Sequence, residues 1–148
     1  AYADLAGVEL VIEAATENEG LKLRILKEID SIVPATTVIA TNTSSISITK
    51  LAASVSSPSR FIGMHFFNPV PLMALVELIR GLQTSDETVA AVQAFATAIG
   101  KTPIAVKNSP GSAMKCSSVR RRCAWKRWWA RPSRRVRCFT ASRAVGRT

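Results

Sequence analysis

Cysteine is missing from the first 115 residues of this 148-residue chain, and histidine occurs only once. The three cysteines, Cys116, Cys123 and Cys138, are separated by seven and fifteen positions and form no CxxC pair. A zinc site of the usual kind needs several His and Cys ligands, so no bound metal is expected. Because residues 1–115 need no disulfide, we expect a reducing compartment and a cytoplasmic location.

Long apolar runs are missing too, although 47% of the residues are hydrophobic, which is enough for a sizeable core. No run reaches the roughly 18 to 20 residues that a membrane-spanning helix needs, so no membrane partner is expected. No basic segment precedes an apolar stretch at the N-terminus, and we expect no signal peptide. The chain begins at Ala1 without an initiator methionine, which is typical of a fragment or a processed chain.

Acidic residues are missing after Glu87. Up to Lys107 the chain has eight basic and ten acidic residues, a net charge of −2. Residues 108–148 have twelve basic residues and no acid, a net charge of +12, and they also hold every tryptophan. The overall charge of +10 therefore describes neither part, and by itself it does not indicate a nucleic-acid-binding protein.

Amphipathic patterns in the first part predict helices. Apolar residues at helical spacing predict a helix over residues 19–32, which Pro34 ends. A short helix is predicted over residues 48–55, with Ser45 or Ser47 as its N-cap.

A third helix is predicted from the capping box of Thr84 and Glu87 to Gly100, which sits where a C-terminal glycine belongs. Apolar and β-branched segments between the helices predict strands. These strands are expected over residues 7–12, 37–40, 60–66, 75–79 and 103–106.

Strands that alternate with helices predict βαβ units and a mostly parallel sheet with helices on both faces. The expected fold class is therefore α/β, with a doubly wound, Rossmann-like architecture whose ligands bind at the carboxyl ends of the strands. Those ends fall at residues 13–17, 41–44 and 65–68, where polar side chains gather.

His65 lies at the end of a predicted strand, and taken alone it is most simply a histidine with a satisfied hydrogen bond. Glu77 changes this interpretation, because it is a carboxylate inside the apolar segment 75–79 and a buried charge needs a partner. If the two strands are neighbours, Glu77 orients the imidazole and stabilises its protonated form. His65 is then a better general base near neutral pH.

The other polar groups have ordinary explanations as well. Residues 41–45 form either a strand-to-helix turn with capping side chains or a set of hydroxyls presented to a ligand. Glu13, Glu17 and Glu19, with Lys22, are typical of a solvated helix start whose acids lie favourably for the helix dipole. Spacing alone does not decide between these alternatives.

Several ordered motifs resemble the 3-hydroxyacyl-CoA dehydrogenase family. They are VIEAATEN at 11–18, TNTSS at 41–45, GMHFFNPVP at 63–71, LVELIRG at 75–81, GKTP at 100–103 and KNSPG at 107–111. One such motif is weak evidence, whereas their order and separations together cover residues 4–111. Relatives that act on sugar acids resemble the chain less, because their histidine is typically followed by proline and not by Phe66 and Phe67.

The resemblance implies an oxidoreductase that oxidises 3-hydroxyacyl-CoA, such as 3-hydroxybutyryl-CoA, to 3-oxoacyl-CoA in fatty acid metabolism. Carried over residue by residue, it implies that His65 takes the proton of the 3-hydroxyl group while Glu77 holds and polarises His65. Ser44 is then a contact of the substrate oxygen near the nicotinamide.

The same resemblance implies NAD as the cofactor and no metal. Asn68 is expected beside the nicotinamide ring, and Glu17 and Lys22 match positions that contact the NAD ribose region. By the same resemblance, Ser44 is expected to contact both cofactor and substrate. The intact family forms homodimers, which we do not expect of this chain because the helical C-terminal domain of the family is absent.

Two departures from the family lead us to expect an incomplete domain. The family begins with a strand and a GxGxxG loop that cradles the pyrophosphate, and nothing similar precedes Ala1. After Gly111 the family continues with an apolar, Asn-containing stretch, which is missing here. We therefore expect a partial NAD-binding domain over residues 1–111, an exposed sheet edge where the first strand is missing, and no useful rate of hydride transfer.

The basic tail, residues 112–148, has three interpretations. It could bind nucleic acid through arginines with interleaved tryptophans, which is the alternative function. It could be a membrane-surface helix, although Pro132 interrupts it. We favour a third, a GC-rich gene translated in a shifted frame, because the change falls inside a motif. On this interpretation the tail has no defined fold and nucleic acid is not the expected partner.

Overall fold

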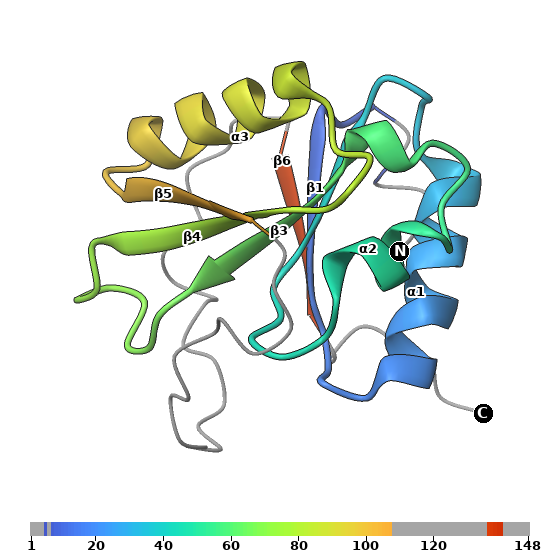
Figure 1. Cartoon of the computed structure of the whole chain (residues 1–148), viewed down its shortest axis with the longest axis horizontal. Helices are drawn as coiled ribbons and strands as arrows, with labels where there is room; N and C mark the ends of the chain where they lie inside the picture. The colour runs from blue at the N-terminus through green and yellow to red at the C-terminus, as the bar shows by residue number, and fades with distance from the viewer. Residues whose placement is uncertain (1–4, 6, 108–135, 141–148) are drawn as a thin grey trace.

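The computed structural model describes residues 5, 7–107 and 136–140, which form one sheet with helices on both faces (Figure 1). The six strands of this described part lie in the order β5-β4-β3-β2-β1-β6, and every neighbouring pair is parallel except β3 and β4. The predicted α/β class with a mostly parallel sheet is confirmed. The strands are β1 (Leu10–Ala14), β2 (Val38–Thr41), β3 (Phe61–Phe66), β4 (Leu75–Arg80), β5 (Thr102–Lys107) and β6 (Val136–Thr140), and the helices are α1 (Glu19–Ile32), α2 (Ile48–Ala52) and α3 (Asp86–Ala98), with a 3-10 turn at Pro58–Arg60.

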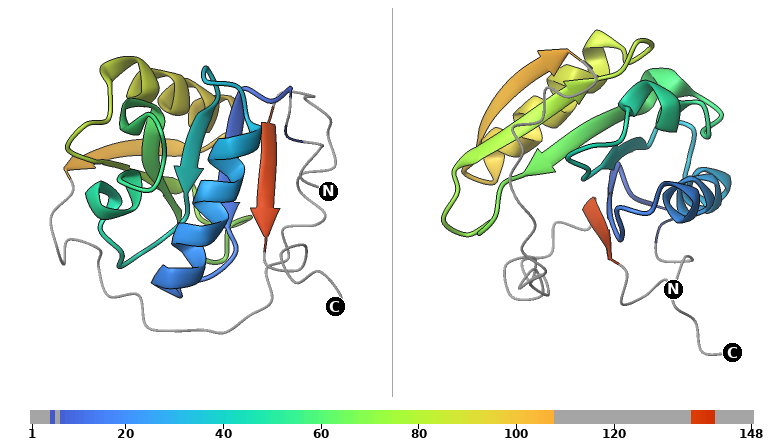
Figure 2. Two further views of the ribbon diagram at one scale, coloured as in Figure 1. Left: turned by 90° about the vertical axis from the view of Figure 1, so that its right-hand side faces the viewer. Right: turned by 60° about the horizontal axis from the view of Figure 1, so that its bottom comes forward.

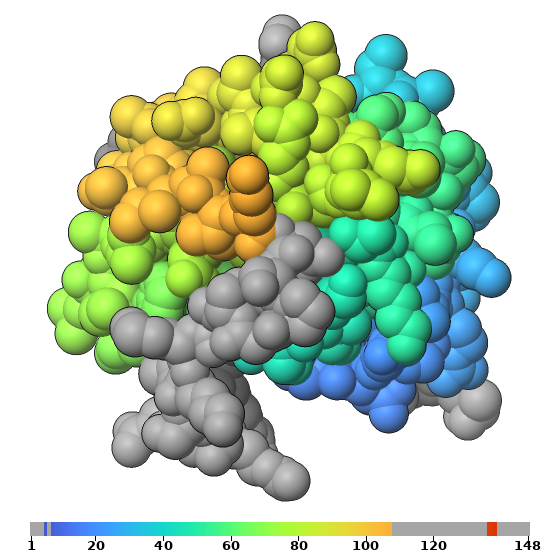
Figure 3. All heavy atoms as spheres, in the orientation of Figure 1, coloured from blue at the N-terminus to red at the C-terminus, as the bar shows by residue number. Residues whose placement is uncertain are grey.

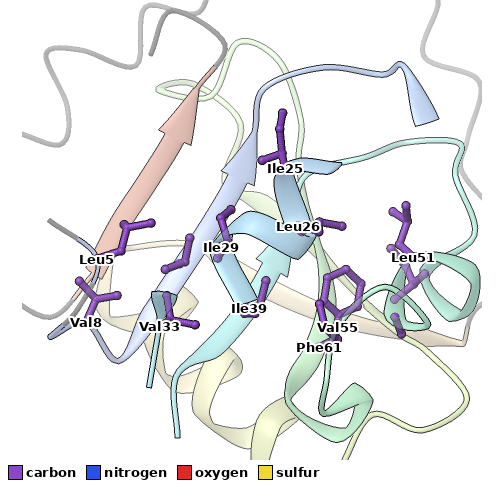
Figure 4. Packing of buried hydrophobic residues seen from close by; sticks show 13 residues of the cluster. Leu5, Val8, Ile25, Leu26, Ile29, Val33, Ile39, Leu51, Val55 and Phe61 are labelled. Atoms are coloured by element: carbon purple, nitrogen blue, oxygen red, sulfur yellow. The ribbon is translucent and has the colours of Figure 1, made fainter. Parts of the chain in front are cut away.

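The alternation of side chains along the strands creates two hydrophobic cores, one on each face. Val11, Ile39 and Phe61 point into the core under α1 and α2, which Figure 4 shows from close by. Ile12 and Ile62, each one position further along its strand, point into the core under α3. Because both faces are covered, these strands are apolar at nearly every position, as parallel strands generally are.

Gly63 in β3 allows α2 to pack directly on the sheet. A Cβ atom at this position would lie 2.8 Å from Cδ1 of Ile48 in α2 and 2.8 Å from Cβ of Ile79 in β4. Both distances are well below a normal carbon contact, so any larger residue must displace the helix or the neighbouring strand. The glycine therefore sets the distance between this part of the sheet and its covering helix.

The helix ends follow from local hydrogen bonds. The Asn18 side chain accepts from the Leu21 N–H at 2.9 Å and starts α1, whose bounds are those predicted from the sequence. Ser47, one of the two predicted caps, accepts from the Lys50 N–H and starts α2. Gly100 has a φ of 75° after the end of α3, which confirms its role at the C-terminus of that helix.

The predicted capping box at the start of α3 is wrong. Ser85 is the N-cap, and its side chain accepts from the Thr88 N–H at 3.2 Å. The Thr84 hydroxyl instead donates to the Phe61 carbonyl at 2.7 Å and accepts from the Gly81 N–H at 3.0 Å. Thr84 is buried and ties the turn to the start of β3, so its hydroxyl is not available to the helix.

Strand β6 lies on the outer side of β1 (Figure 2), where we expected an exposed edge. It pairs with β1 in parallel, from Leu10 opposite Val136 to Ala14 opposite Thr140. Val136 and Cys138 pack against the core under α3. The tail was expected to have no defined fold, and these five residues differ from that expectation because they continue the sheet. The tail's other residues lie outside the described part of the chain.

Candidate functional site

Strands β1, β2 and β3 are mutually parallel, so their carboxyl ends meet at one edge of the sheet. Glu13 pairs with Thr41, so β1 and β2 end side by side, and Thr41 pairs with Gly63, three residues before the end of β3. Asn42, directly after β2, ties two of these ends together, because its side-chain oxygen accepts from the Phe66 N–H at 3.0 Å. No pattern in the sequence indicated this role of Asn42.

The predicted contact between His65 and Glu77 is present. The two residues face each other in the antiparallel pair of β3 and β4, and Nδ1 of His65 lies 2.9 Å from Oε2 of Glu77. Only 11% of the His65 side chain and 16% of the Glu77 side chain are exposed. The Phe67 ring lies against the imidazole with its centroid at 4.8 Å.

This geometry determines what the His65 imidazole can do. An ionised carboxylate only accepts hydrogen bonds, so the proton is assigned to Nδ1 of His65, whose N–H donates a hydrogen bond to Glu77. In the neutral ring, Nε2 then holds the free lone pair that a general base needs. When Nε2 takes up a proton, the adjacent Glu77 carboxylate stabilises the positive imidazolium. The pair can therefore accept a proton from a hydroxyl group placed next to Nε2.

Glu17 connects two loops at the same edge. It is exposed, and its Oε2 accepts from the Thr43 hydroxyl at 2.8 Å and more weakly from the Ser45 hydroxyl at 3.5 Å. Glu17 belongs to the loop after β1, whereas Thr43 and Ser45 belong to the loop after β2. Ser44, which stands between Thr43 and Ser45 in the sequence, is half-buried. These contacts leave the Glu17 carboxylate accessible while fixing where it lies.

Lys22 and Glu13 are not part of a solvated helix start, and that interpretation is wrong for both. Their side chains are 0% exposed, and the Lys22 ammonium lies 2.5 Å from Oε2 of Glu13. The Thr41 hydroxyl donates to the same carboxylate oxygen at 2.7 Å and accepts from the Lys22 ammonium at 3.1 Å. The other carboxylate oxygen accepts from the Ala15 N–H at 2.8 Å.

This triad of Glu13, Lys22 and Thr41 is fully buried at the carboxyl ends of β1 and β2. It links β1, α1 and β2 through charge-assisted hydrogen bonds. A contact between Lys22 and a bound molecule requires movement of its present partners or of the atoms that enclose it. β1 continues to Ala14 and includes Glu13, whereas the strand predicted from the sequence ended at residue 12. No pattern in the sequence therefore indicated that the Glu13 carboxylate is buried.

Asn68 follows the end of β3 and is exposed, and the peptide bond between Asn68 and Pro69 is cis. Asn68 and Ser44 thus both follow strands whose carboxyl ends meet at the edge that carries His65. Among residues 5, 7–107 and 136–140, no group of three or more His, Cys, Asp or Glu side chains could hold a metal ion. In the same residues, no helix is long and apolar enough to cross a membrane.

Comparison with known proteins gives a consistent result. Residues 1–109 match the family described as 3-hydroxyacyl-CoA dehydrogenase, NAD binding domain. The fatty acid oxidation complex subunit alpha of Acinetobacter baylyi is 51% identical over 110 residues, which are 74% of this chain and 15% of that protein.

Solved structures agree with this match. The crystal structure of (S)-3-hydroxybutyryl-CoA dehydrogenase PaaH1 from Ralstonia eutropha is 68% identical with a TM-score of 0.74, over 75% of this chain and 39% of that one. The 3-hydroxybutyryl-CoA dehydrogenase of Escherichia coli K12 is 42% identical with a TM-score of 0.71, over 74% of this chain and 23% of that one. The chain therefore spans well under half the length of these relatives.

Proposed function

The chain belongs to the 3-hydroxyacyl-CoA dehydrogenase family as part of its NAD-binding domain, and from this we propose that its strand-end edge serves the oxidation of a 3-hydroxyacyl-CoA by NAD. The observation that carries the proposal is the contact between His65 and Glu77 at the carboxyl end of β3. We assign residues 1–111 to the NAD-binding domain and residues 112–148 to a tail beyond the family match, which ends at residue 109.

The residues at the edge suit the nicotinamide half of NAD. Glu17 offers an exposed carboxylate, held by the Thr43 hydroxyl, that can accept hydrogen bonds from ribose hydroxyl groups. Ser44 and Asn68 offer a hydroxyl and an amide at the ends of neighbouring strands. Lys22 supports this arrangement, since its ammonium holds Glu13 and Thr41.

In the proposed mechanism, bound NAD supplies the hydride acceptor. The chain's own contribution is proton transfer and orientation. Nε2 of His65 accepts the proton of the substrate 3-hydroxyl group while the hydrogen on C3 leaves with its electron pair. Glu77 holds the ring through Nδ1 and stabilises the imidazolium, and Ser44 positions the substrate oxygen.

We propose that residues 1–148 alone oxidise a 3-hydroxyacyl-CoA only slowly. Hydride transfer needs both reactants held in near-attack geometry, and the chain covers only 39% of the Ralstonia eutropha dehydrogenase. The alternative function, nucleic-acid binding by the basic tail, has no support from β6, because these five described residues of the tail pair with β1.

The test is NADH formation from 3-hydroxybutyryl-CoA by the purified chain, with His65→Gln as the matched variant and NAD binding measured by calorimetry. We expect weak NAD binding and a slow rate that His65→Gln abolishes. A rate that is unchanged in His65→Gln contradicts the assignment of the base. Turnover equal to that of a complete relative contradicts the proposal that the chain alone is slow.

A further inference from the structure

The turn between β3 and β4, residues 67–74, leads from His65 to Glu77 and carries Asn68. Its tip has no regular secondary structure, and it is closed by the N–H groups of Leu72 and Met73, which both donate to the Pro69 carbonyl at 3.0 Å. Leu72 is 81% exposed, whereas Val70 is partly buried and packs against the core under α3. Packing of Val70 holds one part of this turn, and a polar contact to the carbonyl groups of the turn holds it as well.

A buried lysine supplies that contact. Lys101 lies in the turn between α3 and β5 and is only 7% exposed. Its ammonium donates to the Val70 carbonyl at 2.6 Å and to the Met73 carbonyl at 2.8 Å. The adjacent Thr102 N–H donates to the Ala74 carbonyl at 2.7 Å. Both turns lie at the left of Figure 1, and in Figure 3 the surface of β5 adjoins that of β4 and the segment before it.

A lysine at this position has an energetic cost that its hydrogen bonds must offset. Removing an ammonium from water is unfavourable unless strong acceptors replace the water. Hydrogen bonds that involve a charged partner are shorter and stronger than neutral ones, as the two distances of Lys101 indicate. One ammonium also holds two carbonyl groups that are three residues apart, which an apolar side chain cannot do.

We propose that Lys101 is a positioning residue that fixes the turn at residues 69–73 and thereby places Asn68 at the strand-end edge beside His65. Asn68 directly precedes Pro69, whose carbonyl closes the turn, so the place of Asn68 follows from that of the turn. The functional part of this inference rests on the function proposed above, whereas the tether itself does not. Lys101 acts on the site only through the backbone of the turn.

The test uses the full 148-residue chain, labelled with ¹⁵N. Lys101→Met removes the ammonium at similar side-chain length, and Lys101→Arg keeps a positive donor. Lys107→Met is the matched control, because Lys107 is an exposed lysine on β5. We expect amide exchange at Leu72 and Met73 to become about tenfold faster in Lys101→Met, which corresponds to the net loss of about one hydrogen bond. Lys101→Arg should restore part of this protection, and Lys107→Met should match the unmodified chain.

The side-chain amide of Asn68 reports on positioning, which a purely structural role would leave unchanged. In Lys101→Met we expect the chemical shifts of the Asn68 side-chain amide to change and its order parameter to fall, while the melting temperature changes little. Unchanged exchange at Leu72 and Met73, or an unchanged Asn68 side chain, overturns the inference. If Lys101→Met does not fold, Lys101→Arg decides. Asn68 signals that match those of the unmodified chain, with equally slow exchange at Leu72 and Met73, support the inference. Loss of the Asn68 signals in the folded Lys101→Arg variant overturns it.

Addition of NAD separates this inference from the proposed function. A shift of the Asn68 signals of the unmodified chain on NAD addition, weakened in Lys101→Met, supports both. No shift in the unmodified chain contradicts the proposed function, while the exchange and order measurements still decide the role of Lys101.

Discussion

Replacement of Lys22 by methionine would leave the Glu13 carboxylate buried without its counter-ion. Both side chains are 0% exposed, and their atoms approach to 2.5 Å. Breaking a buried ion pair by removing one partner costs about 3–5 kcal/mol, because the remaining charge is uncompensated. Since domains of this size have a free energy of unfolding of about 5–15 kcal/mol, Lys22→Met should remove a large share of it.

The double variant Glu13→Gln with Lys22→Met separates the charge from the packing. It removes both charges together, and replacing a buried pair by neutral groups is often nearly neutral for stability. We therefore expect the double variant to be more stable than Lys22→Met alone. Lys50→Met is the control for an exposed pair, because the Lys50 and Glu19 side chains are 62% and 41% exposed, and it should change stability by less than about 1 kcal/mol.

Urea unfolding followed by far-ultraviolet circular dichroism measures these free energies. Every tryptophan falls within residues 125–129, which lie outside the described part of the chain, so the circular dichroism of the helices and strands is the signal to follow. If the free energy of unfolding of Lys22→Met lies within about 1 kcal/mol of that of the unmodified chain, the reasoning is refuted, because Glu13 is then solvated or neutralised. A double variant less stable than Lys22→Met would also refute it.

Three further changes test other contacts. Gly63→Ala should lower the free energy of unfolding by about 1–3 kcal/mol in a urea titration, because its Cβ would lie 2.8 Å from Ile79 Cβ. An unchanged free energy of unfolding would show that the neighbouring elements move apart at no cost. Hydrogen bonds from the backbone of Glu87 and from the Ser85 hydroxyl lower the pKa of Glu87, so its contribution to stability is present above the ordinary pKa and is lost as the pH falls through the lowered one. Glu87→Gln should therefore flatten the loss of stability in acid, and an unchanged acid slope would argue against this. Cys138 packs against the core under α3, so Cys138→Asp should detach β6 from β1. The uncovered edge of β1 can then pair with other chains, and light scattering should show increased self-association. A monodisperse variant would contradict this.

Features that depend on residues close together in the sequence were predictable. The bounds of α1 were predictable because apolar residues recur at helical spacing and Pro34 follows the last of them. The contact between His65 and Glu77 was predictable because a carboxylate in an apolar strand must find a partner and the chain has only one histidine.

Features that depend on distant contacts were not predictable. Thr84 and Ser85 are both good caps, and only the Phe61 carbonyl decides that Thr84 is engaged elsewhere. Glu13 lies one residue beyond the predicted strand, and its partner Lys22 lies on the following helix, where a lysine is usually exposed. Strand β6 pairs with β1 across more than a hundred residues, and neither its charge nor its short length indicated this.

The most direct test of the central claim is the response of His65 to NAD. His65 is the only histidine, so its ring gives a single set of signals in a ¹³C- or ¹⁵N-labelled chain. The chain is titrated with NAD and, in parallel, with ADP-ribose, which lacks the nicotinamide. We predict a saturable shift of the His65 ring signals with NAD and a smaller one with ADP-ribose. Ring signals that stay unchanged up to the highest soluble NAD concentration, or that shift equally with both compounds, would contradict the claim that His65 faces the nicotinamide.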